Sequence, residues 1–280
     1  MTRSTLPQLR IGEFMVTGLS DGKLTADLAV LSNIEKDEAQ RRLVAAGAQD
    51  PSSININCFL IEGKGKTILI DSGAGGLNHW GGLLNEQLAC CNIKPDDIDM
   101  ILLTHAHPDH IGGLLTNAEA PTFPNATLIM HQNEYAFWSD DATFVQANER
   151  AQRNFIFARK VFAHYKDQIK IIEGGEIFPD LHAVPLPGHT PGHTGYMICS
   201  GGQQLLIWGD IVHFPDIQIA DPDVAIAFDN DKVAAIQTRK NILKSVSADK
   251  ILVAGMHFGQ LAFAYIAEHQ GQFLIQYHHR

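Results

Sequence analysis

Three histidines and one aspartate lie within six residues of one another in the segment His105-Ala106-His107-Pro108-Asp109-His110. Imidazole nitrogens and carboxylate oxygens are the ligands that suit zinc and its first-row neighbours. A polar cluster of this density is costly to bury without partners, so the segment predicts a metal site. Alternate residues point apart on a turn that opens into a helix. His105 and His107 can therefore face one ion, while Asp109 and His110 face a second.

Three further polar side chains each follow an apolar run. His189, in the segment Gly-His-Thr-Pro-Gly-His193, follows residues 184–187, and Asp210 and His257 follow two later runs. Each lies next to a glycine turn just past an expected buried strand. Loops at strand ends carry binding residues and gather at one edge of a sheet. We therefore expect these side chains to meet the first cluster.

The elements that must position these groups alternate between strands and helices. We expect a hairpin of residues 10–17 and 23–31 around Asp21-Gly22, and further strands over 54–61, 66–70, 100–104, 126–130 and 251–254, with four or five more between 168 and 209. Helical spacing predicts helices over 35–47, 83–91, 132–138, 146–165 and 231–246. The pattern indicates a layered α/β fold with helices outside packed sheets. We expect one domain over residues 1–280.

Composition narrows the classes of function. The hydrophobic share of 45% is that of an ordinary soluble globular protein, and the net charge of −10 argues against nucleic acid as a partner. The chain has no run of 18 apolar residues, so we expect no membrane span. Because residues 1–7 lack the apolar stretch of a signal peptide, we expect a cytoplasmic location. The cysteines are expected to be reduced apolar fillers, namely Cys58, Cys90, Cys91 and Cys199.

The order of these motifs resembles the metallo-β-lactamase superfamily of metal-dependent hydrolases. The match runs from Asp71 through His-x-His-x-Asp-His, Gly-His189 and Gly-Asp210 to His257. It implies an αββα sandwich, in which two packed mixed sheets carry helices on both outer faces and two metal ions lie at one edge.

The resemblance also implies a ligand set. The first ion would be bound by His105, His107 and His189, the second by Asp109, His110 and His257, and both by Asp210. His193 is expected to support the site rather than bind an ion. Asp71 occupies the family's position for a carboxylate that orients a ligand histidine. We expect two divalent ions, with zinc as the first choice and iron or manganese as alternatives.

Two cations that share a carboxylate can also share a hydroxide. Coordination lowers the pKa of bound water toward about 7, and one ion can polarise the oxygen of a carbonyl or phosphoryl group. Asp109 is assigned the transfer of a proton to the leaving group. We expect hydrolysis of small carboxyl esters, lactones or organophosphate triesters.

Departures from the patterns of individual subgroups of the family reduce the range of possible substrates. Asp210 stands where true β-lactamases of this fold usually carry cysteine or serine, and the 23 residues after His257 are too few for the helical domain of glyoxalase II-like thioesterases. The closest subgroups are those of methyl parathion hydrolase and of the quorum-quenching lactonases. His213 stands where many lactonases place a tyrosine. Two roles stay open for it: donation to an oxyanion, or a place in the pocket wall.

Alternative functions are an N-acyl-homoserine lactonase proper, and a di-iron sensor of the same fold that binds oxygen. The expected partner is a small molecule, with neither nucleic acid nor membrane, and the resemblance leaves a homodimer open. Two or three aromatic side chains are expected to line the site, from the set Trp80, Phe137, Trp138, Phe144, Phe155 and Phe157. The remaining histidines are expected to have no catalytic part, namely His79, His131, His164, His182, His269, His278 and His279.

Overall fold

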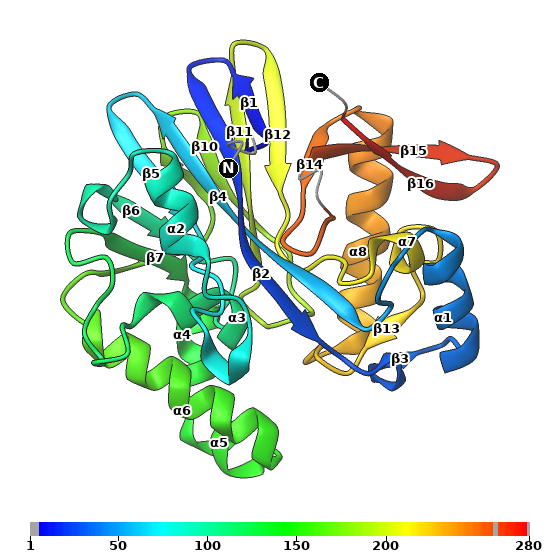
Figure 1. Ribbon diagram of the computed structural model, residues 1–280, viewed down its shortest axis with the longest axis horizontal. Coiled ribbons are helices and arrows are strands. Elements are labelled where there is room, and N and C mark those ends of the chain that lie inside the picture. Colours follow the sequence, from blue (N-terminus) through cyan, green and yellow to red (C-terminus); the bar gives the residue numbers. More distant parts are fainter. Residues whose placement is uncertain (1–5, 260–262, 279–280) are drawn as a thin grey trace.

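The computed structural model describes residues 6–259 and 263–278, and its strands form two seven-stranded sheets that pack face to face (Figure 1). The first sheet has the order β1 (Gln8–Ile11), β2 (Phe14–Thr25), β4 (Ser53–Gly63), β5 (Lys66–Ile70), β6 (Met100–Leu102), β7 (Thr127–His131) and β8 (Ile169–Ile172). The second has the order β16 (Gln272–Tyr277), β15 (Phe263–His269), β14 (Leu252–Ala254), β12 (Gln203–Ile207), β11 (Thr194–Ser200), β10 (Leu181–Pro185) and β9 (Gly175–Phe178). Both sheets are mixed, because β5 to β8 run parallel and β12 pairs in parallel with β14.

Helices cover the outer faces of both sheets (Figure 1). The first sheet is covered by α2 (Leu84–Cys90), α4 (Gln132–Ser139) and α6 (Glu149–His164), and the second by α8 (Lys232–Ala248). The shorter helices are α1 (Lys36–Ala45), α3 (Pro108–Ile111), α5 (Asp141–Gln146) and α7 (Pro215–Gln218). A small ladder joins β3 (Leu31–Ser32) to β13 (Ala225–Ile226). The predicted αββα sandwich is confirmed.

Alternation along the strands sorts the apolar side chains into layers. In β4, Phe59 and Ile61 belong to the cluster between the two sheets, while Cys58 and Leu60 belong to the cluster under the helices. Successive side chains of a strand point to opposite faces, so a strand covered on both faces is apolar throughout. This explains the continuous apolar run of residues 58–61, whereas Asn55 and Asn57 alternate with isoleucines in the earlier part of the strand.

The predicted hairpin around Asp21-Gly22 is wrong. The chain turns at residues 12–13, and Asp21 lies inside β2, where the pairing register shifts between Ser20 and Gly22. The buried carboxylate of Asp21 accepts hydrogen bonds from the backbone N–H groups of Ala74 and Leu84. Asp21 therefore anchors the loop after β5 and the start of α2, which its turn-like sequence does not reveal.

Three smaller expectations also need correction. The helix expected over 146–165 begins at Glu149, because the side chain of Asn148 caps it by accepting from the N–H of Ala151, and α5 is a separate helix. The sequence predicted the strand at 251–254 as the last one, but β15 and β16 follow it. All four cysteines are free, but Cys90 is exposed and so fills no core. Across the described ranges, no helix combines the length and the apolar character that a membrane crossing requires.

Candidate metal centre

Four loops bring the seven predicted ligands together at one edge of the sandwich. The turn at residues 105–110 connects β6 to α3, and His189, Asp210 and His257 follow β10, β12 and β14. Pro108 occupies the first position of α3, where the backbone N–H that proline lacks would have no partner. The seven donors fall into two groups, His105 with His107 and His189, and Asp109 with His110, Asp210 and His257. The structure thus places every predicted ligand at the site.

The first group is a triangle of ring nitrogens. His105 Nε2 lies 3.0 Å from His107 Nδ1, which lies 2.9 Å from His189 Nε2, and the two Nε2 atoms are 3.2 Å apart. Three nitrogens cannot all be satisfied by hydrogen bonds to one another, because each neutral imidazole carries only one proton. Tetrahedral zinc with Zn–N bonds of about 2.0–2.1 Å would hold such nitrogens roughly 3.3 Å apart. The triangle therefore fits one ion.

The second group centres on Asp210. Its Oδ2 atom lies 3.0 Å from His257 Nε2 and 3.3 Å from His110 Nε2, and Asp109 Oδ2 lies 3.5 Å from the same His110 nitrogen. Asp210 Oδ2 is also 3.4 Å from His189 Nε2, so this carboxylate lies between the two groups. Among the described residues, the buried atoms His110 Nε2 and Asp210 Oδ1 have no hydrogen-bond partner. Buried polar atoms normally have partners, so the donor set fits a second ion with Asp210 shared.

In the turn at residues 105–110, the Nδ1 atoms of His105 and His110 lie next to hydrogen-bond partners outside the donor groups. His110 Nδ1 lies 2.7 Å from Asp71 Oδ2, which places Asp71 in the orienting position expected from the sequence. Thr104 Oγ1 donates to the same oxygen of Asp71 and lies 3.0 Å from His105 Nδ1. An acceptor at one ring nitrogen keeps the proton there and leaves the other nitrogen free to bind an ion.

Two orienting partners were missed by the sequence analysis. Asp229 Oδ1 lies 2.9 Å from His189 Nδ1, and the backbone oxygen of Asn55 lies 2.6 Å from His257 Nδ1. Asp229 is buried, and it lies on a loop before α8 that carries no ligand of its own. Neither spacing nor residue type distinguishes it from the neighbouring Asp231, so only the fold reveals its role.

Glu134 is a further residue that the sequence analysis missed. Its Oε1 atom accepts from the backbone N–H of Ala106 at 2.8 Å and from Trp138 Nε1 at 2.6 Å. Its Oε2 atom accepts from Thr190 Oγ1 at 2.6 Å and from the N–H of Gly192 at 3.2 Å. One buried carboxylate thus ties the ligand turn after β6 to the ligand loop after β10. Burial raises the pKa of Glu134.

His193 and His213 flank the centre in different ways. His193 uses both ring nitrogens, because Nε2 accepts from the N–H of Asp210 at 2.9 Å and Nδ1 lies 2.9 Å from the backbone oxygen of Leu186. It therefore supports Asp210, and burial lowers the pKa of His193 to about 3. His213 Nε2 lies 3.2 Å from Asp210 Oδ2, while its ring stacks on His257 with centroids 4.9 Å apart. His213 also lines the cavity, which is compatible with both roles left open.

Burial and neighbouring charges shift the pKa values of the titratable groups of the centre in different directions. Burial lowers the pKa of His105 and His107 well below the usual value, so both stay neutral, as ligands must be. Burial also opposes a charge on His110, but the nearby carboxylates of Asp210 and Asp109 raise its pKa well above the usual value. Burial opposes ionisation of Asp109, yet the charge of His110 outweighs it and lowers the pKa of Asp109. The carboxylates thus require a positive charge at the second group.

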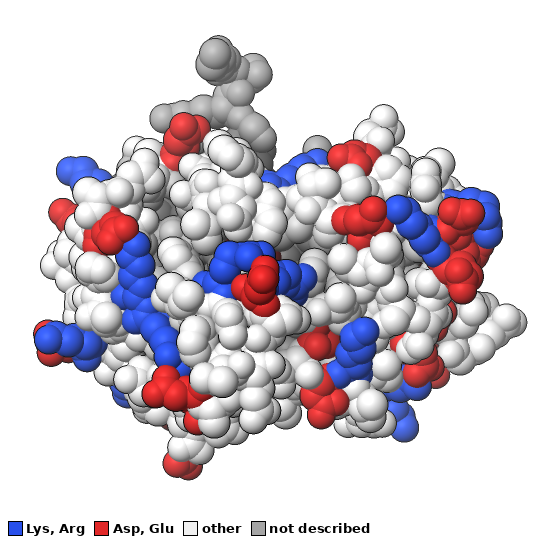
Figure 2. Space-filling model, turned by 90° about the horizontal axis from the view of Figure 1, so that it is seen from below, with Lys and Arg blue, Asp and Glu red and all other residues white. Residues whose placement is uncertain are grey.

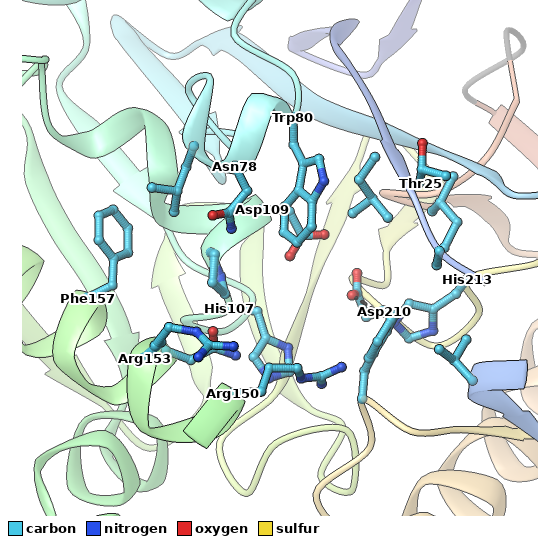
Figure 3. Close-up of a pocket in the computed structure, with 18 of the residues that line it drawn as sticks. Thr25, Asn78, Trp80, His107, Asp109, Arg150, Arg153, Phe157, Asp210 and His213 are labelled. Carbon is cyan, nitrogen blue, oxygen red and sulfur yellow. Dashed lines mark ion pairs between the residues drawn. The ribbon is translucent and has the colours of Figure 1, made fainter. Parts of the chain in front are cut away.

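A cavity of about 680 Å³ opens onto these donors (Figure 3). His107, Asp109, Asp210 and His257 line its base. An apolar wall includes Trp80, and the further apolar side chains of the lining include Leu24, Ala26, Val30, Ile54, Leu77, Ile156, Phe157 and Phe228. Of the predicted aromatic set, Trp80 and Phe157 line this cavity, and Phe137, Trp138 and Phe155 line a neighbouring one of about 670 Å³. Phe144 packs against the core under α6.

The remaining described histidines lie outside both donor groups. His131, for example, accepts from the N–H of Asn133 and so caps α4. His279 lies outside the described residues.

An apolar cavity with a few convergent polar groups at its base has the usual form of a small-molecule site.

Comparisons with known proteins agree with this geometry. A family model described as the metallo-beta-lactamase superfamily matches residues 54–255. The uncharacterized protein YobT of Bacillus subtilis is 31% identical over 162 residues, which are 57% of this chain and 63% of YobT.

Two solved structures superpose over 98% of this chain and 98% of their own. The hydrolase AbOPH of the beta-lactamase superfamily is 27% identical, with a TM-score of 0.90. AidC, a dizinc quorum-quenching lactonase solved with the product N-hexanoyl-L-homoserine, is 24% identical, with a TM-score of 0.91. The second likeness concerns the fold alone.

Proposed function

Because the chain belongs to the metallo-beta-lactamase superfamily, and its family and neighbours support a metal-dependent hydrolase, we propose a binuclear hydrolase of small ester-like substrates. The substrates would be carboxyl esters, lactones or organophosphate triesters. One observation carries the proposal: seven nitrogen and oxygen donors form two groups at the base of a largely apolar cavity, and Asp210 Oδ2 of one group lies 3.4 Å from His189 Nε2 of the other.

The residues present fit two divalent ions, with zinc preferred for the three-nitrogen group. His105, His107 and His189 would hold one ion, Asp109, His110 and His257 the other, and Asp210 both. When bound, such a pair supplies Lewis acidity and lowers the pKa of water, so that a nucleophile exists at neutral pH.

The chain's own groups would then position the substrate and move protons. Asp109 is the more exposed of the two ligand carboxylates that line the cavity, at 13% against 2% for Asp210, and in our proposal it carries a proton to the leaving group. His213 lines the cavity beside Asp210 and can donate from Nε2 to an oxygen that gains negative charge. The apolar wall around Trp80 would hold an acyl or aryl group and exclude water.

A lactonase proper is a second candidate within the same chemistry. The position of His213 at the cavity, with Nε2 3.2 Å from Asp210 Oδ2, favours it. A lactonase requires a hydrogen-bond donor beside the carboxylate of Asp210, and His213 lies there, three residues after Asp210.

A panel assay at neutral pH tests the proposal. The purified protein would be offered an aryl ester, an acyl-homoserine lactone, methyl parathion and nitrocefin, each with and without a chelator. We expect chelator-sensitive turnover of the ester or the lactone, and negligible turnover of nitrocefin. Strong nitrocefin hydrolysis, or ester hydrolysis that ignores the chelator, would refute the proposal. Metal analysis and a visible spectrum of the same sample distinguish zinc from a di-iron centre.

A further inference from the structure

Two arginines on one helix face border the cavity above the donors. Arg150 and Arg153 lie three residues apart in the first turns of α6, so they share a face of this helix, and both line the cavity. Figure 3 shows them near His107, on the side of the cavity opposite Trp80. Seen from below in Figure 2, basic side chains gather near the middle of the face. The cavity thus has an apolar side and a cationic side.

The side chain of Arg150 is held in place without a counter-ion. Its guanidinium carbon lies 4.6 Å from the ring centroid of Phe228, a contact that fixes the group over the cavity. Arg150 is an exposed residue of the cavity lining, and partial burial of its guanidinium lowers its pKa. Among the described residues, neither Arg150 nor Arg153 has a carboxylate within 4 Å, whereas the third cation of the cavity, Lys160, pairs with Glu119.

The acids that line this cavity together with the arginines belong to the donor groups. Asp109 and Asp210 are the only carboxylates lining the cavity within the described part of the chain, and both belong to the donor groups. Two divalent ions at those groups would outweigh the two carboxylates. The loaded cavity would then be positive in a protein whose net charge is −10. A positive cleft with apolar walls concentrates anions.

Resting on the proposed function, we infer that the preferred substrate is an amphipathic ester that carries its own ionised carboxylate or phosphate. The anionic group pairs with the guanidinium of Arg150, with Arg153 beside it, while the apolar part lies on the wall around Trp80. The scissile bond then lies between them, over the donors. Guanidinium groups bind carboxylate and phosphate oxygens through paired hydrogen bonds. Neutral lactones and phosphotriesters have no group that would use these arginines.

The test compares matched substrates. Mono-4-nitrophenyl glutarate ends in a carboxylate, its methyl ester is a neutral counterpart, and a third ester carries a phosphonate in place of the carboxylate. For each protein, kcat/KM for an anionic ester is divided by kcat/KM for the neutral one. We expect Arg150→Gln to lower this ratio at least tenfold for one or both anionic esters. Arg150→Lys should retain part of the preference, and Arg41→Gln, which removes an exposed arginine of α1 that does not line the cavity, should leave the ratio unchanged.

Equilibrium binding tests the anion site independently of the proposed hydrolase function. Glutaric acid monoanilide, an amide analogue of the first ester, is titrated into the metal-loaded protein and into Arg150→Gln. Tenfold weaker binding to the variant supports the anion site, even if none of the esters is hydrolysed and the proposed function fails. Equal turnover of anionic and neutral esters, with a ratio that Arg150→Gln does not change, overturns the inference and leaves the hydrolase intact.

Discussion

Replacing Asp229 by asparagine tests how the first donor group is held. The carboxylate is buried, and its Oδ1 atom lies 2.9 Å from His189 Nδ1. Burial opposes its ionisation, but the hydrogen bond and charge of His189 outweigh burial and lower the pKa of Asp229. An asparagine side chain at this position would keep the shape and lose the charge, so the proton on His189 would no longer be fixed at Nδ1.

The size of the effect follows from that one contact. A hydrogen bond to a charged group contributes about 1.5–3 kcal/mol, and loss of a partner behind a ligand histidine typically weakens metal binding by roughly 10- to 100-fold. We therefore expect Asp229→Asn to lose about 10- to 100-fold in affinity for one of its two ions. Competition with a chromogenic chelator measures both affinities, and metal analysis after dialysis should approach one ion per chain.

Asp231→Asn is the matched control. Asp231 lies on the same loop, is exposed, and caps α8 by accepting from the N–H of Ala234 at 3.0 Å. Asparagine caps helices about as well as aspartate, so both the metal affinities and the stability should stay close to those of the wild type. If Asp229→Asn retained both ions with wild-type affinity, or Asp231→Asn lost as much, Asp229 would have no role in orienting His189.

Three further changes probe other parts of the site. Asp210→Ala should release at least one ion and abolish most activity, and retention of both ions in metal analysis would show that Asp210 is not shared. Glu134→Gln would place an NH₂ group against donors that now share a carboxylate, and should lower the free energy of unfolding by about 2–4 kcal/mol in urea titrations. The exposed control Glu86→Gln should change it by less than about 0.5 kcal/mol. His193 has its folded-state pKa lowered to about 3, so the unfolded chain takes up a proton first as the pH falls below the ordinary value of about 6.5. Between pH 6 and 4, the free energy of unfolding of the metal-free protein should therefore fall by about 1.4 kcal/mol per pH unit because of His193. His193→Asn should remove this contribution from unfolding curves measured at a series of pH values. An unchanged slope would contradict a buried, neutral His193 ring.

The ligands could be located from the sequence because each of them is marked locally. His189, Asp210 and His257 each follow an apolar strand and a glycine turn, and the carboxyl ends of those strands meet at one edge of the sandwich. A layered α/β fold was equally accessible, since strands and helices differ in the period of their apolar residues, whereas the αββα order was implied by the family resemblance.

Partners of the ligands could not be found in this way. Asp229 and Glu134 act across long sequence separations, and an isolated carboxylate on a loop or a helix has the same local pattern as a solvated one. Asp21 is a case in which the local pattern predicts the wrong structure. Its Asp-Gly pair is typical of a turn, yet the side chain is buried because two distant N–H groups need an acceptor.

Each donor group draws on both halves of the chain. His105 and His107 come from the half that builds the first sheet, and His189 from the half that builds the second; Asp109 and His110 are likewise completed by Asp210 and His257. A fragment that ends before β9 would hold only part of either group. Ions that bind the joined halves and not the separate ones favour the joined state by mass action. The divalent cations of the proposed centre should therefore stabilise the contact between the two halves, in addition to the apolar cluster that joins the sheets.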